Sequence, residues 1–243
     1  MHIDQDLMIL QAPSTGLQLD LTQGVSGEVR VWLAHEFDSI AAQLRPWGRW
    51  TTPVRVEVVG DQQSLRAAAT CETRLQLTGI AGLNQVTILS PQRWPVPPTS
   101  AQLLQAMVHE LAHVLLFQRC CPSGQVLPPY IATWFREGMA VVVAEGAPSP
   151  NLRRDLGFHP HLDHLPNADD ARMADDAAAC YLAAALLFQA WMDRFGAVGL
   201  TSLCRAMRAG HPFAEAHLRA CDLTEAAFVS NWVAAVRAEA KLQ

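Results

Sequence analysis

Two histidines four residues apart, His109 and His113, have the residue type and spacing of metal ligands. They lie in the segment 106–116, AMVHELAHVLL, where Glu110 follows the first histidine. Because residues i and i+4 lie on one face of a helix, both imidazoles could bind one metal ion, and Glu110 could accept a proton from a water molecule beside it. The alternative is an amphipathic helix that carries two histidines. The flanking side chains are apolar, however, and polar groups buried there without partners would be costly.

A third ligand is expected elsewhere in the chain, because a catalytic zinc ion usually has three protein ligands and leaves one position for water. The segment 133–140, TWFREGMA, offers Glu137. Its neighbours in sequence are aromatic and aliphatic, which does not fit a glutamate on a solvated helix face. We expect this segment to form a second helix that returns alongside the first, with Gly138 allowing the two helices to approach closely.

The segments that must position these residues show clear periodicity. Apolar residues at helical spacing predict a helix that begins at Thr99 or Ser100 and a later helix that ends at Gly196. The predicted helices are 26–46, 99–118, 130–146, 175–195, 198–209 and 222–241, and the predicted strands are 54–59 and 83–89. Prolines at 91–98 then separate a mixed front part from an all-helical back part.

The motif HELAH followed by WFREGMA resembles the gluzincin metallopeptidases, and among them the small bacterial peptidase MA-like domains. Softer similarities, such as TPVRVEVV and YLAAALLFQAWMDRFG, extend through most of the chain. The resemblance implies an α+β, zincin-like fold. An α/β lobe over 1–98 would carry an edge strand at the substrate cleft, for which 83–89 is the expected strand. A helical lobe over 99–243 would carry the zinc site and complete one catalytic unit.

The same resemblance implies a role for each site residue. His109, His113 and Glu137 would bind one Zn²⁺ per chain, and Glu110 would act as general base on zinc-bound water. In the related aminopeptidases a tyrosine at the start of a comparable helix donates a hydrogen bond to the tetrahedral oxyanion, and Tyr181 stands in the matching place. The alternative for Tyr181 is a core tyrosine whose hydroxyl reaches the surface.

Two departures from the related families bear on activity. Where the aminopeptidases carry a glutamate that binds the free amine of the substrate, this chain has Leu83, which favours an endopeptidase over an aminopeptidase. Where thermolysin-like enzymes carry an aspartate one turn after the glutamate ligand, this chain has Val141. The groups that would orient the two histidines are therefore not assigned by the sequence.

Composition narrows the function classes further. The formal net charge is −5 and no basic patch stands out, which argues against a nucleic-acid partner. No apolar run approaches the ~20 residues that span a membrane, and the first residues lack a signal-peptide pattern, so we expect a cytoplasmic protein. The six cysteines are expected to be mostly buried thiols.

These observations predict a zinc metallopeptidase acting on a peptide or protein substrate. The rival interpretations are an inactive zincin-fold protein that binds peptides or acts as a scaffold, and a metal-free helical interaction protein. A histidine-rich segment, FHPHLDH at 158–164, is interpreted as a surface loop, with a second metal site as the alternative.

Overall fold

The computed structural model describes residues 8–22, 24–69, 78–166 and 175–242. The chain forms two compact units, Met1–Gln118 and Arg119–Gln243. The described residues form a five-stranded sheet and eight α-helices, so the fold is mixed α and β, as the α+β prediction required. The predicted roles of the two lobes, a substrate cleft at 1–98 and a zinc site within 99–243, stay predictions.

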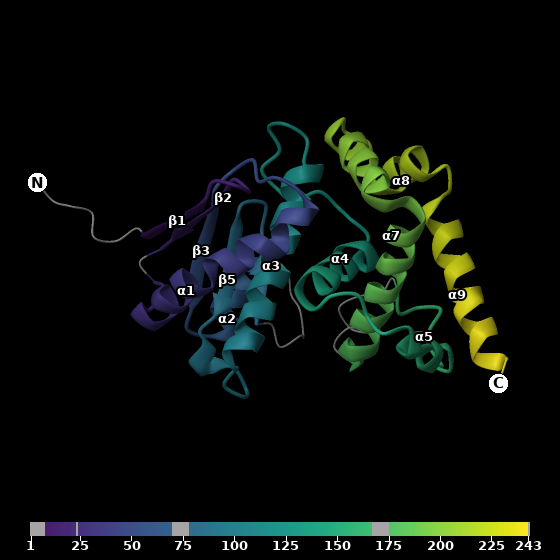
Figure 1. The fold of residues 1–243 in the computed structure, drawn as a ribbon, viewed down its shortest axis with the longest axis horizontal. Helices are drawn as coiled ribbons and strands as arrows, with labels where there is room; N and C mark the ends of the chain where they lie inside the picture. Colours follow the sequence, from purple (N-terminus) through teal and green to yellow (C-terminus); the bar gives the residue numbers. More distant parts are fainter. Residues whose placement is uncertain (1–7, 23, 70–77, 167–174, 243) are drawn as a thin grey trace, which may run out of the picture. The chain divides into compact units, whose positions relative to one another are not determined.

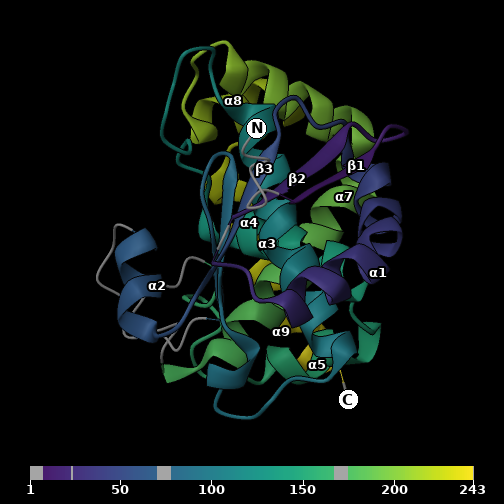
Figure 2. The ribbon, with the colours of Figure 1, turned by 90° about the vertical axis from the view of Figure 1, so that its left-hand side faces the viewer.

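The first unit is built around the sheet (Figure 1). Its strands are β1 (Met8–Ala12), β2 (Leu17–Leu21), β3 (Val54–Val59), β4 (Gly79–Ala81) and β5 (Gln85–Leu89), and their order is β1-β2-β3-β5-β4. Strands β2, β3 and β5 run parallel, and the outer strands β1 and β4 pair antiparallel to their neighbours. Figure 2 shows β1, β2 and β3 after a quarter-turn.

The prediction that 83–89 forms the edge strand of the sheet was wrong. Strand β5, within the predicted 83–89, pairs with β3 on one side and with β4 on the other, so in the described sheet the edge is β4. Four consecutive residues of β5, from Val86 to Leu89, are buried. Such a continuous buried run is typical of an interior strand that is covered on both faces.

Helices α1 (Gly27–Leu44), α2 (Gln62–Ala69) and α3 (Ser100–Cys120) complete the first unit, and α3 ends two residues past the unit's last residue, Gln118. Helix α3 begins with a capping box: Thr99 Oγ1 accepts from Gln102 N at 3.3 Å, and Gln102 Oε1 accepts from Thr99 N at 2.9 Å. The cap is therefore Thr99. The indole Nε1 of Trp32, on α1, donates to Ser100 Oγ at 2.9 Å and ties the two helices together at this point.

A buried glutamine, Gln118, fastens the other end of α3 to the sheet. Its Oε1 accepts from the backbone N–H groups of Thr51 and Thr52, at 3.1 and 3.3 Å. Its Nε2 donates to Thr52 O and to Asn84 Oδ1, both at 3.0 Å. These four hydrogen bonds satisfy the buried amide and fix the position of α3 relative to the segments that precede β3 and β5.

The second unit is helical in its described part. It contains α4 (Thr133–Glu145), α5 (Pro150–Gly157), α7 (Ala177–Arg208), α8 (Phe213–Cys221) and α9 (Glu225–Lys241). The helices predicted at 130–146 and 222–241 are confirmed. Those predicted at 175–195 and 198–209 form the single run α7, which is broken at Gly196, where φ is +59°. Helices α5 and α8 were not predicted.

Aromatic side chains form the core of the second unit around His217, which is fully buried. The ring contacts join Trp134 and Phe135 of α4 to Phe188 and Trp191 of α7 and to Phe213 and Phe228. Because indole N–H can only donate, His217 Nε2 accepts from Trp191 Nε1 at 3.1 Å, and His217 Nδ1 donates to Leu223 O at 2.8 Å. Burial lowers the pKa of His217, which favours the neutral ring that this pairing requires.

The cysteine prediction is confirmed for the described residues. Cys120, Cys121, Cys180 and Cys204 are buried free thiols, and Cys221 is half-buried. Cys71 lies outside the described residues.

Candidate metal centre

The two histidines of α3 point their ring nitrogens at the same place. The distance between His109 Nε2 and His113 Nε2 is 3.1 Å, and the two rings are nearly perpendicular, at 86°. His113 is buried and stacks on Phe117 one turn further along α3, whereas His109 is half-buried. The i, i+4 spacing therefore places both imidazoles on one face of α3, as predicted from the sequence.

Helix α4 carries Glu137, which is 8% exposed. The neighbouring Arg136 donates from Nε to Glu137 Oε1 at 2.9 Å, so the guanidinium holds one carboxylate oxygen. The sequence did not assign this arginine. The only sequence feature that could have indicated a role for Arg136 is its position next to Glu137, a carboxylate expected to bind a metal.

Gly138 does allow a close approach of two helices, but the partner was predicted wrongly. A Cβ at residue 138 would meet the carbonyl oxygen of Ala184 and lie 2.6 Å from the Cβ of Phe188, and both residues belong to α7. The close partner of α4 at this point is therefore α7. This contact fixes the part of α4 that carries Glu137.

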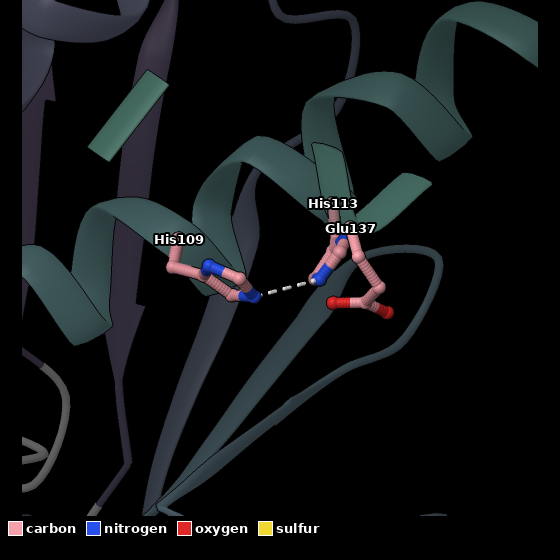
Figure 3. A group of neighbouring side chains, drawn as sticks. All are labelled: His109, His113 and Glu137. Carbon is pink, nitrogen blue, oxygen red and sulfur yellow. Dashed lines mark hydrogen bonds between the residues drawn. The ribbon is translucent and has the colours of Figure 1, made fainter. Parts of the chain in front are cut away.

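His109, His113 and Glu137 each offer one ligand atom, and these atoms all lie within 4.8 Å of one another (Figure 3). In the described part of the chain, no other group of three or more His, Cys, Asp or Glu residues could hold a metal ion. Two nitrogen ligands at the usual zinc distance of ~2.0–2.1 Å in a tetrahedral site lie about 3.3 Å apart, close to the 3.1 Å between the histidine nitrogens. The types of the three donors, and the spacing of the two histidine nitrogens, are therefore compatible with a metal ion such as zinc.

Glu110 follows His109 on α3 and is half-buried. Its side chain lies directly over Gly79, the first residue of the edge strand β4. A Cβ at residue 79 would be 2.7 Å from Glu110 Cγ and 2.9 Å from Glu110 Oε1. Gly79 was not predicted as a site residue, although a glycine inside a strand often marks a close approach of another group.

Tyr181 lies in the second turn of α7 and is half-buried. On a helix, residues 181, 184 and 188 share one face, because they are spaced by three and four. Ala184 and Phe188 are the α7 residues that meet Gly138, so Tyr181 is on the same side of α7, one turn before that contact. Its predicted role in catalysis stays a prediction.

The histidine-rich segment 158–164 forms no metal group with other described residues. Arg237 of α9 donates to the carbonyl oxygens of Gly157 and His159, at 3.2 and 2.9 Å, and to Asp163 Oδ2 at 3.2 Å. The Nε2 atom of His159 pairs with Asp176 Oδ2 at 2.9 Å, and Asp176 caps the N-terminus of α7. These contacts give the segment a structural role in holding α5, α7 and α9 together.

Comparisons with protein-family models and with curated proteins gave no match. A further finding concerns membranes: within the described residues, no helix combines the length and the apolar character that a membrane span requires.

Proposed function

We propose that the chain is a zinc-dependent metallopeptidase of gluzincin type that hydrolyses internal bonds of a peptide or protein substrate. The grouping of His109, His113 and Glu137 carries this proposal. Two imidazole nitrogens and one carboxylate are the ligand set of known catalytic zinc sites, in which a fourth position is left for water or substrate. The resemblance of HELAH and WFREGMA to the gluzincin pattern supports the same interpretation.

Each residue has a distinct task in the proposed reaction. Zinc, when bound, would polarise the scissile carbonyl and make a water molecule more acidic. Glu110 accepts a proton from the attacking water and passes it to the leaving amine. Arg136 holds one oxygen of Glu137 and so limits the rotation of that carboxylate.

Tyr181 is proposed to donate a hydrogen bond to the oxyanion that forms when water attacks the carbonyl. We expect Tyr181→Phe to keep zinc but to lower turnover by at least about tenfold, because one donor to the developing negative charge is lost. The measurement is turnover of fluorescein-labelled casein beside zinc content by elemental analysis. Unchanged turnover would leave Tyr181 as a core residue of α7.

The zinc content of the purified chain tests the proposal. We expect about one zinc ion per chain and a zinc affinity lowered more than about 100-fold in Glu137→Ala, because a ligand is lost outright. Glu145→Ala is the matched control, since Glu145 is exposed at the end of the same helix and should leave zinc binding unchanged.

Two outcomes would redirect the proposal. A wild-type chain that takes up no zinc even with excess metal would contradict the metal site and favour a metal-free helical protein. A chain that binds one zinc ion but cleaves no fluorescein-labelled casein would favour the zincin-fold scaffold over the peptidase.

A further inference from the structure

The side chain of Glu110 lies so close to Gly79 that any residue other than glycine would collide with it. A Cβ there would come within 2.7 Å of Glu110 Cγ, 2.9 Å of Oε1 and 3.0 Å of Cδ. All three atoms belong to the outer part of the glutamate side chain. The carboxylate of Glu110 therefore lies against the bare backbone of β4, and both residues belong to the first unit.

The strand itself gives no reason for a glycine at this position. Gly79 pairs with Ile88 in a regular antiparallel register, and it is not among the glycines with positive φ. An alanine would fit this extended backbone and would lose less conformational entropy on folding. The contact that excludes a side chain is the one with Glu110.

We propose that Gly79 is a positioning residue, whose missing side chain leaves the space in which the Glu110 carboxylate is held. The inference rests on the proposed function, in which Glu110 is the general base. A general base must lie within ~2.6–3.2 Å of the atom that carries the proton it accepts, so the space that receives its carboxylate determines its efficiency. The backbone of β4 supplies a rigid surface for that carboxylate, because β4 pairs with β5 and the residue just before β4 is held as well, with Leu89 N donating to Thr78 O at 2.9 Å.

A methyl group at residue 79 should move the glutamate and not the fold. The atoms that it would meet are the end of a flexible side chain, which can rotate away, whereas the backbones of α3 and β4 can stay in place. Gly79→Ala is therefore expected to fold and to bind zinc, with its Glu110 carboxylate displaced. Gly82→Ala is the matched control, because a Cβ at residue 82 would have no neighbour nearer than 3.7 Å.

The experiment compares the zinc-loaded wild-type chain with the two glycine variants. Each protein is labelled with ¹³C-glutamate, and the Glu110 carboxyl signal is identified by its loss in Glu110→Gln. We expect its chemical shift to change in Gly79→Ala and to stay the same in Gly82→Ala. On fluorescein-labelled casein, kcat of Gly79→Ala should fall about 100-fold, with KM within about twofold and zinc content unchanged.

The outcomes separate the inference from the proposed function. A Glu110 signal in Gly79→Ala with the same chemical shift as in the wild type would overturn the positioning role, whatever the activity. A displaced signal in a protein whose wild type cleaves no casein would uphold the positioning role and count against the peptidase. If Gly79→Ala lowers the melting temperature, adding Glu110→Ala should restore it, because the colliding side chain is removed. No recovery in the double variant would also overturn the inference.

Discussion

Glu110→Gln is expected to bind zinc as tightly as the wild-type chain and to hydrolyse casein about 1,000-fold more slowly. The amide has nearly the shape of the carboxylate, so it can occupy the same space over Gly79. It cannot accept the proton of the attacking water, and general-base catalysis typically contributes ~10²–10⁴-fold to a rate. Zinc content by elemental analysis and turnover of fluorescein-labelled casein are the two measurements.

The control for this variant is Glu145→Gln, which makes the same chemical change at an exposed glutamate and should leave turnover unchanged. Turnover of Glu110→Gln above about one-tenth of the wild-type rate would mean that another group accepts the proton. Loss of zinc together with turnover would instead make Glu110 a metal ligand.

Gly138→Ala is expected to destabilise the folded chain by about 3 kcal/mol, the upper part of the usual range for overpacking a well-packed contact. In an open helical position the same change would stabilise, because alanine has a higher helix propensity than glycine by about 1 kcal/mol. At residue 138 the added methyl would meet the backbone carbonyl of Ala184 and lie 2.6 Å from Phe188 Cβ. A backbone carbonyl in the middle of α7 cannot rotate away, so α4 and α7 must separate.

Urea denaturation of the two proteins measures this difference. Gly27→Ala is the matched control, because Gly27 begins α1 and a Cβ there would have no neighbour within 4 Å. We expect the control to be neutral or slightly stabilising. Equal stability of Gly138→Ala and the wild type would mean that the α4–α7 contact is looser than described. Zinc affinity should also fall in Gly138→Ala, since Glu137 is the adjacent residue.

Local patterns in the sequence were sufficient for the elements that carry the candidate site. Helical periodicity predicted α1, α3, α4 and α9 close to their observed bounds, and alternation predicted β3. The i, i+4 spacing of His109 and His113 was enough to place both rings on one face, because the geometry of an α-helix is independent of the rest of the fold. The positive φ of Gly196 likewise follows from local backbone preference.

Contacts between distant segments were decided by the tertiary structure. Strand β4 has only three residues, too few for a periodic signal, yet its pairing with β5 makes it the edge of the described sheet. The partner of Gly138 was misjudged because a glycine shows that a neighbour is close but not which helix supplies it. Helix α5 was missed because it is short and rich in polar residues.

The sequence alone was therefore sufficient to place His109, Glu110 and His113 together on a helix. It was also sufficient to predict Glu137 as the third ligand. The tertiary structure decided what lies against each of them: Phe117 against His113, Arg136 at Glu137, and Gly79 beneath Glu110. The physical reason is the range of the interactions. Helix geometry repeats within a few residues, whereas the space around a carboxylate depends on which strand the whole chain brings beside it.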